Sequence, residues 1–263
     1  MPAFSPDGNQ VAFVNWDAEN SGIYTTLIDG ERPLRLTDNP TDCFPVWSPD
    51  GRQVAFSRHG DTSSLYMVSA LGGAPHRIYD GKAASFTNWS WSPDGKKIAF
   101  AEGERSHTHI ALLSLADSVS RSLTSPPAQN WDAWPVFSPD GSLVAFSRGA
   151  GIADGSSELY VVSPSGGEPR RLTFQSGTVE GMAWTPDSRE IVYSSPRNGL
   201  FTLWRILATG GHHSPLPESA PARPTPALPQ RAIAWPTSKR SGVAVLDDSI
   251  CRTPNICGAH LSN

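Results

Sequence analysis

Short apolar runs recur along the chain, and each follows a polar turn of nearly constant sequence. An aromatic residue is followed by Ser-Pro-Asp-Gly four times and by Thr-Pro-Asp-Ser once. A β-rich apolar run such as Val-Ala-Phe comes next, with the length of a buried strand. The aromatic residues are Phe4, Trp47, Trp91, Phe137 and Trp184. The apolar runs are residues 11–13, 54–56, 98–100, 144–146 and 191–193. The pattern predicts five β-hairpins.

Each residue of the turn suits its position. Proline presets φ at the second position, aspartate suits the third, and glycine at the fourth accepts a positive φ. Ser188 replaces this glycine in the fifth repeat, so a positive φ there predicts local strain and the weakest of the five turns. Carboxylates on separate hairpins cannot converge on one ion, so we interpret the aspartates as turn-stabilising rather than metal-binding.

Two further strands complete each repeat. The third strands are predicted at residues 23–27, 65–68, 110–113, 159–162 and 203–206. The fourth strands are predicted to end at Leu36-Thr37, Ile78-Tyr79, Leu123-Thr124, Leu172-Thr173 and Leu216-Pro217. The aromatic residues recur at steps of 43, 44, 46 and 47 residues. This period marks a radial array of four-stranded blades, a β-propeller, in which the repeated aromatics pack between blades.

A degraded repeat ends the chain. Five clear blades cover residues 1–217, and residues 218–263 predict a sixth blade without its outer strand. The period places its turn near Leu228, whereas strand length favours a start at Trp235. We expect one all-β domain over residues 1–263, a six-bladed propeller of four-stranded antiparallel blades with an incomplete last blade. Residues 1–4 already belong to the first blade and cannot complete the sixth, so we expect a truncated gene product or a fragment of a longer protein.

The aromatic-Ser-Pro-Asp-Gly-x-x-Val/Ile-Ala-Phe signature, the later Leu-Tyr-Val-Val and the closing Arg-Leu-Thr resemble the WD40-like repeat of TolB-type β-propellers. The resemblance covers residues 1–217 and is specific for a fold. It implies a non-catalytic binding or interaction domain, a fragment of a larger bacterial sensor or envelope protein. Similar propellers also form the amino-terminal halves of prolyl-oligopeptidase-like serine peptidases, so the alternative is the gating portion of such an enzyme without its catalytic domain.

Composition and motifs exclude several function classes. A net charge of -4 with 17% charged residues provides no basic stripe for nucleic acid. No apolar run approaches a membrane span, and the N-terminus lacks a signal-peptide pattern. We therefore expect a cytoplasmic protein if the chain is complete, and a periplasmic or extracytoplasmic one if it belongs to a longer exported protein. Nucleophile-elbow, phosphate-loop and zinc-helix motifs are absent from the sequence, so we expect no enzyme, no cofactor and no metal.

The candidate site lies in the loops that join each outer strand to the next inner strand. In propellers these loops surround the mouth of the central channel on one face, while the other face here consists of near-identical tight turns. Aromatic and acidic side chains on such loops suit a protein or peptide partner, with a glycan as the alternative. The candidate ligand-binding residues are Asp42, Phe44, Phe86, Trp89, Trp131, Asp132, Trp134 and Glu180. Trp131, Asp132 and Trp134 are the best candidates, although the tryptophans could instead only cap the channel.

Overall fold

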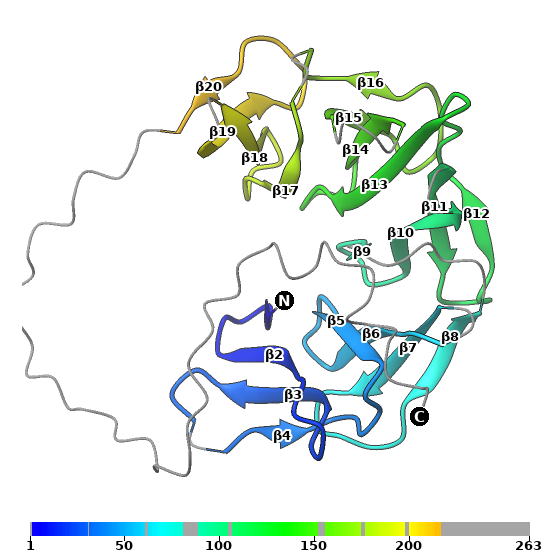
Figure 1. Ribbon diagram of the computed structural model, residues 1–263, viewed down its shortest axis with the longest axis vertical. Helices are drawn as coiled ribbons and strands as arrows, with labels where there is room; N and C mark the ends of the chain where they lie inside the picture. Colours follow the sequence, from blue (N-terminus) through cyan, green and yellow to red (C-terminus); the bar gives the residue numbers. More distant parts are fainter. Residues whose placement is uncertain are drawn as a thin grey trace, which may run out of the picture. The chain divides into compact units, whose positions relative to one another are not determined.

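The described residues form five four-stranded antiparallel sheets that follow one another along the chain (Figure 1). The computed structural model describes residues 2–30, 32–60, 63–80, 89–104, 107–151, 156–174, 177–197 and 200–216. Within each sheet, strands adjacent in sequence pair with each other, so every sheet is a simple meander. The blades of an all-β propeller predicted from the sequence are confirmed.

The strands have the following bounds. Blade 1 contains β1 (Ala3–Phe4), β2 (Gln10–Asn15), β3 (Gly22–Leu27) and β4 (Leu34–Arg35). Blade 2 contains β5 (Asp42–Trp47), β6 (Gln53–Arg58), β7 (Ser64–Ser69) and β8 (His76–Asp80). Blade 3 contains β9 (Trp89–Trp91), β10 (Lys97–Glu104), β11 (His107–Ser114) and β12 (Ser120–Ser122). Blade 4 contains β13 (Asn130–Phe137), β14 (Val144–Ala150), β15 (Ser157–Val162) and β16 (Arg170–Arg171). Blade 5 contains β17 (Glu180–Trp184), β18 (Glu190–Arg197), β19 (Leu200–Leu207) and β20 (Ser214–Pro215).

Five blades are described, whereas the sequence predicted six. The sixth blade was predicted at residues 218–263, which lie outside the described residues, and it stays a prediction. The second and third strands contain every residue expected of them. The fourth strands end earlier than expected in four of the five blades. In blades 1, 3 and 4 a Leu-Thr pair follows the strand, and the threonine hydroxyl accepts a hydrogen bond from an amide of the third strand. Thr37 Oγ1, for example, accepts a hydrogen bond from the Ile23 amide at 3.0 Å.

Each of the five turns contains the same set of hydrogen bonds. In blade 3 the Ser92 hydroxyl donates to Asp94 Oδ1 at 2.6 Å and accepts from the Lys97 amide at 2.8 Å. Asp94 Oδ1 also accepts from the Lys96 amide at 3.0 Å. The serine bond, followed by the Lys96 amide bond, lowers the pKa of Asp94. The equivalent aspartates of the other blades have the same partners, so these carboxylates stabilise the turns, as the sequence predicted.

The fourth turn residue has a positive φ in every blade. It is 73° at Gly8, 69° at Gly51, 69° at Gly95, 71° at Gly141 and 60° at Ser188. The left-handed region is open to glycine but costly for serine. The strained fifth turn predicted from the sequence is therefore confirmed in its backbone conformation.

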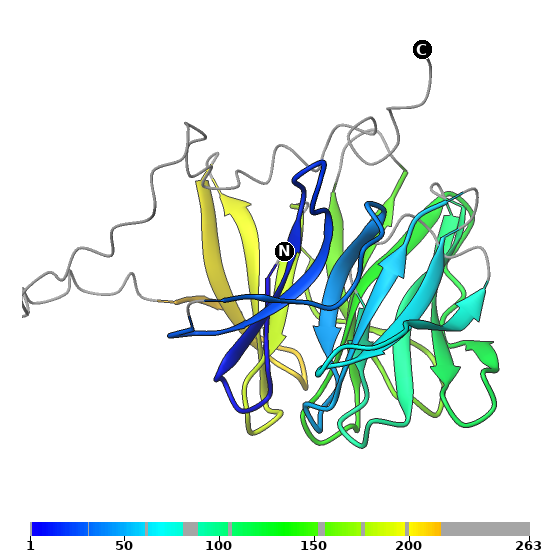
Figure 2. The ribbon, with the colours of Figure 1, turned by 90° about the horizontal axis from the view of Figure 1, so that it is seen from below.

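The hydrophobic core is divided among the contacts between consecutive blades. Ala12 and Ile23 of blade 1, for example, share a cluster with Val54 and Phe56 of blade 2. Three similar clusters join blades 2 and 3, blades 3 and 4, and blades 4 and 5. Figure 2 shows the strands of neighbouring blades standing side by side along these contacts. Each blade is thus stabilised by its neighbours, which is the expected energetics of a repeat protein.

In blades 2 to 5 the repeated aromatic residue packs against the blade before it. The Trp47 indole donates to the Ala3 carbonyl of blade 1 at 3.1 Å, and the Trp184 indole donates to the Val136 carbonyl of blade 4 at 3.0 Å. Trp47, Trp91 and Phe137 are buried, and Trp184 is half-buried. Phe4 was expected to be buried as well, but it is 66% exposed. This prediction is wrong because no blade among the described residues precedes Phe4.

Candidate functional site

The candidate site lies at the end of the blades opposite the Ser-Pro-Asp-Gly turns. We call it the loop end. Its described parts are residues 15–17, 42–44, 58–59, 130–134, 148–151 and 173–174. The first strand of each blade starts at this end, and its second strand finishes there. Figure 1 shows the first strands β5, β9, β13 and β17 on the inner side of the array of blades.

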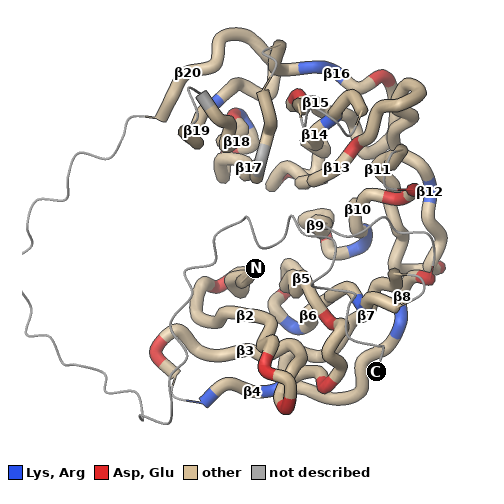
Figure 3. The backbone as a smooth tube through the Cα atoms, viewed as in Figure 1, with Lys and Arg blue, Asp and Glu red and all other residues tan. Residues whose placement is uncertain are grey.

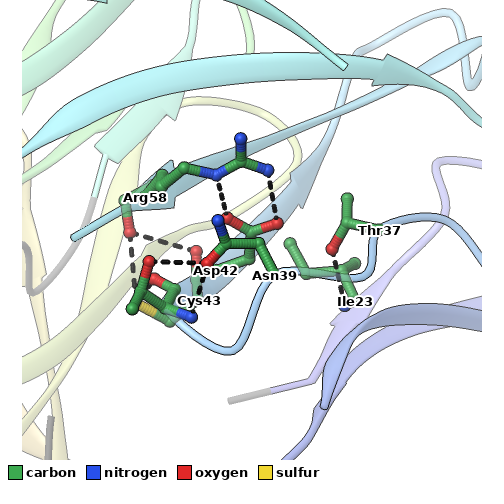
Figure 4. A network of polar contacts seen from close by, with 8 residues as sticks. Ile23, Thr37, Asn39, Asp42, Cys43 and Arg58 are labelled. Atoms are coloured by element: carbon green, nitrogen blue, oxygen red, sulfur yellow. Dashed lines mark hydrogen bonds and ion pairs between the residues drawn. The ribbon is translucent and has the colours of Figure 1, made fainter. Parts of the chain in front are cut away.

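A buried ion pair occupies the loop end of blade 2. The Asp42 side chain is 0% exposed, and both of its oxygens accept hydrogen bonds from Arg58. The Nε–Oδ1 distance is 2.6 Å and the Nη2–Oδ2 distance is 2.9 Å (Figure 4). The hydrogen bond to Asp42 raises the pKa of Arg58 above its usual value. The guanidinium group lies over the Tyr66 ring, 4.4 Å from its centroid, where a cation–π contact adds to the ion pair.

Blade 4 repeats this arrangement. Asp132 is 0% exposed and accepts from Arg148 Nε at 2.6 Å and from Arg148 Nη2 at 2.8 Å. The guanidinium group of Arg148 lies 4.9 Å from the centroid of the Tyr160 ring. Burial lowers the pKa of Arg148, but the bond to Asp132 opposes this effect and the pKa is raised. The sequence analysis placed Asp42 and Asp132 among the candidate ligand-binding residues. In the structure both carboxylates are buried, and both oxygens of each accept hydrogen bonds from an arginine.

Sequence reasoning missed both arginines, although a signal existed. In each of the two blades the arginine follows the aspartate by 16 residues. The equivalent position of blade 3 carries Glu102, which breaks the pattern. The recurring Asp–Arg spacing could have predicted a cross-strand ion pair in place of two free acids.

A β-bulge follows each buried aspartate. The register shifts between Cys43 and Val46 in blade 2 and between Ala133 and Val136 in blade 4. Within these bulges Phe44 has a φ of 53° and Trp134 a φ of 59°. Large aromatic residues rarely adopt the left-handed region, and such outliers cluster at functional sites. The two positions differ in packing, because Phe44 contacts the core cluster between blades 2 and 3.

Trp131 is held in a fixed orientation over its neighbouring strand. Its indole Nε1 donates to the Gly151 carbonyl at 2.8 Å. The ring lies over Gly149, where an added Cβ would stand 2.2 Å from Trp131 Cζ2. Gly149 therefore leaves the space that the ring fills. Because the side chain is only half-buried, Trp131 is a rigid aromatic surface whose hydrogen-bond donor is already used within the protein.

The remaining candidates are less favourable or lie outside the description. Trp89 is 4% exposed and belongs to the core cluster between blades 2 and 3, so it packs rather than faces a ligand. Phe86 lies outside the described residues, and Glu180 is described only as the first residue of β17. Two exposed aromatics at the loop end were missed by the sequence reasoning: Trp16 is 55% exposed and Phe174 is 73% exposed.

A polar cluster on blades 2 and 3 contains the residue types of a hydrolase triad. The Tyr79 hydroxyl donates to Glu102 Oε1. His109 Nε2 lies 3.4 Å from Glu102 Oε2 and 3.0 Å from the Ser122 hydroxyl oxygen. A triad needs the acid and the serine on different nitrogens of the histidine ring. Here both approach Nε2, so this geometry cannot relay a proton from serine to the acid.

A cavity of about 20 Å³ between blades 4 and 5, lined in part by Ser157, Tyr193 and Trp204, has space for about one water molecule. Three or more histidine, cysteine, aspartate or glutamate side chains do not gather anywhere in the described part of the chain. No helix that could cross a membrane occurs among these residues either. Acidic and basic residues are scattered over the blades (Figure 3).

Comparison with solved structures places this fold among known propellers. The chain is similar to the structure assigned to TolB of Agrobacterium tumefaciens, with a TM-score of 0.66, 21% identity, and coverage of 82% of this chain and 79% of that one. It is also similar to an oligogalacturonate lyase in complex with manganese, with a TM-score of 0.67, 17% identity, and coverage of 82% and 64%. A prolyl endopeptidase has a TM-score of 0.60, 14% identity, and coverage of 82% and 35%.

Comparison of the sequence with known proteins also finds relatives of this chain. An uncharacterized protein of Agrobacterium fabrum is 30% identical over 111 residues, which are 42% of this chain and 36% of that protein. The matched region thus spans about a third of this relative. The model of the TolB beta propeller domain matches residues 1–154 and 91–231. The chain therefore belongs to the TolB β-propeller family.

Proposed function

We propose that this propeller is a non-catalytic binding module whose loop end receives a segment of a protein or peptide partner. The observation that carries the proposal is Trp131, a half-buried ring held by the bond to Gly151 and by the space over Gly149. A ring already fixed in place loses little conformational entropy when a ligand packs on it. Aromatic anchors of this kind dominate many binding energies.

Other residues of the loop end support binding rather than catalysis. Trp16 and Phe174 add exposed aromatic area at the loop end of blades 1 and 4. The carboxylates of Asp42 and Asp132 are engaged by Arg58 and Arg148, so they are not available as a general acid and base. The opposite end of the blades presents the same hydrogen-bonded turn five times, with little variety for selective recognition.

The propeller part of a peptidase remains the second candidate, supported by the likeness to a prolyl endopeptidase. In such an enzyme the propeller would screen access to a separate catalytic domain. The genomic sequence on either side of this reading frame would distinguish the two candidate functions. A hydrolase domain beside it would favour the peptidase, and a sensor or envelope domain would favour the binding module. A six-bladed propeller, in which residues 218–263 supply an incomplete last blade, is part of the same proposal.

The test of binding uses Trp131 without disturbing the buried ion pairs. Arrays of synthetic peptides and of oligosaccharides are probed with the protein and with two variants, Trp131→Ala and Gly149→Ala. Gly149→Ala keeps the tryptophan but forces its ring to move, so both variants should lose capture of the same peptides.

Leu71→Ala provides the matched control, since Leu71 is 89% exposed in a turn at the other end of blade 2. It should capture peptides as the parent does. Equal capture by all the folded variants would place the ligand elsewhere. Capture of oligosaccharides alone would replace the peptide by a glycan, and no capture by the parent would leave the loop end without a binding role.

A further inference from the structure

Trp134 has a backbone conformation that its own sequence disfavours. Its φ of 59° lies in the left-handed region, which an L-residue with a Cβ adopts at an energetic cost. It also precedes Pro135, and proline restricts the preceding residue toward extended conformations. Asparagine or glycine would suit the position better. Contacts made by the neighbouring residues must therefore stabilise this backbone conformation.

The neighbours of Trp134 fix the chain on both sides of it. Asp132, two residues before, is bonded to Arg148 through both carboxylate oxygens. The carbonyl of Ala133 accepts a hydrogen bond from the Ser147 hydroxyl at 3.2 Å. After the bulge, Val136 pairs again with Ala145 in the strand ladder. These contacts over-determine the backbone at Trp134, so its strain persists in the folded state.

Blade 2 contains the equivalent arrangement, and there the strained residue has a structural role. Asp42 is bonded to Arg58, the Ser57 hydroxyl donates to the Cys43 carbonyl at 3.1 Å, and Phe44 has a φ of 53°. The ring of Phe44 packs against the core cluster between blades 2 and 3 and lies near His59. Its strained backbone thus places an aromatic ring against the core cluster. Trp134 is equally strained and half-buried, but it belongs to none of the four core clusters of the described residues.

We infer that Trp134 is a specificity-determining residue, held strained by the Asp132–Arg148 pair so that it can pack on the proline rings of an extended peptide. This inference rests on the proposed binding function of the loop end. Trp134 lies three residues after Trp131 on β13, an inner strand. Because the indole donor of Trp131 is used on Gly151, that ring offers only an apolar face. Proline-rich segments are stiff and extended before binding, and they dock on surfaces lined by aromatic rings.

The test compares Trp134→Gly with Trp134→Ala and with Phe44→Gly. The probes are a proline-rich decapeptide and a decapeptide in which alanine replaces each proline. The parent should bind the proline-rich peptide at least about tenfold more tightly than the alanine peptide, and Trp134→Gly should lose about tenfold or more of that affinity. Its denaturation midpoint should equal or exceed that of Trp134→Ala, because glycine accepts φ of 59° without strain. Phe44→Gly should lower the midpoint further than Trp134→Gly does.

Each other outcome has a distinct meaning. A midpoint of Trp134→Gly well below that of Trp134→Ala would overturn the strain argument. Unchanged peptide affinity in Trp134→Gly, with affinity lost in Trp131→Ala, would overturn the role of Trp134 and leave the proposed binding function intact. Equal affinity for the two decapeptides would overturn the preference for proline. No binding of either peptide by the parent would overturn both this inference and the peptide-binding proposal.

Discussion

Replacing Asp132 by asparagine should destabilise the protein strongly, because it removes one member of a buried ion pair. The Asp132 side chain is 0% exposed and that of Arg148 is 11% exposed. Asparagine keeps the shape, but at best one of its two side-chain atoms can still accept from Arg148, and its amide faces the guanidinium donors. Breaking a buried pair by removing one charge typically costs about 3–5 kcal/mol, because the other charge stays buried and unpaired.

Blade 2 offers the matched comparison for this prediction. Asp42 is just as buried, but the side chain of Arg58 is 25% exposed and can turn toward water when its partner is lost. Asp42→Asn should therefore cost less, about 1–3 kcal/mol. Chemical denaturation followed by far-UV circular dichroism gives both free energies of unfolding. A double variant, Asp132→Leu with Arg148→Met, should recover most of the loss, since it leaves no unpaired charge.

The reasoning would be refuted by a change of less than about 1 kcal/mol in Asp132→Asn, the value typical of an exposed ion pair. Such a result would mean that the carboxylate is hydrated and available to a ligand, as the sequence alone suggested. A double variant as unstable as the single one would show that packing around Asp132, rather than charge, decides the effect.

Three further predictions concern the blades. Trp91→Ala should cost about 3–5 kcal/mol, because Trp91 is 7% exposed in the contact between blades 2 and 3; an unchanged denaturation midpoint would contradict this burial. Ser188→Gly should raise the stability by up to about 1 kcal/mol, since it relieves the strain of a φ of 60°, while the entropy of glycine and the lost bond from the Asp140 amide to Ser188 Oγ offset part of the gain; a clearly lower midpoint in calorimetry would argue against strain in the fifth turn. The pKa of Asp94 is lowered from 3.8, so its contribution to stability is present above that value and is lost as the pH falls through the depressed pKa. Asp94→Asn should accordingly unfold with a weaker dependence on pH below about pH 4, and an acid limb as steep as that of the parent would contradict this role.

The repeat made the blades predictable from sequence. A turn with one residue type suited to each position, followed by an apolar run of fixed length, defines a hairpin locally, so the strands of all five blades were placed without knowledge of the fold. The ends of the fourth strands were not predicted. In blade 1, for example, the Thr37 hydroxyl accepts a hydrogen bond from the Ile23 amide of the neighbouring strand. This tertiary contact ends the strand before Leu36, and the local pattern does not show it.

The candidate site was predictable only in outline. Loop composition located the aromatic residues correctly at one end of the blades, as Trp131 shows. The sequence analysis missed that Asp42 and Asp132 are buried, because their arginine partners lie on another strand and only the recurring separation of 16 residues pointed to them. It also could not separate Trp89, which packs in the core, from Trp131, which rests on Gly149. Phe4 was misjudged for a related reason, since its burial depends on a preceding blade rather than on its own repeat.

The most direct measurement of the central claim is hydrogen–deuterium exchange of the whole chain with and without a bound peptide from the array. The account predicts slower exchange at the loop end on binding, in residues 130–134 and 148–151, with no change in the five turns at residues 5–8, 48–51, 92–95, 138–141 and 185–188. Protection confined to those turns, or spread evenly over all five blades, would contradict a binding site built on Trp131 and Trp134.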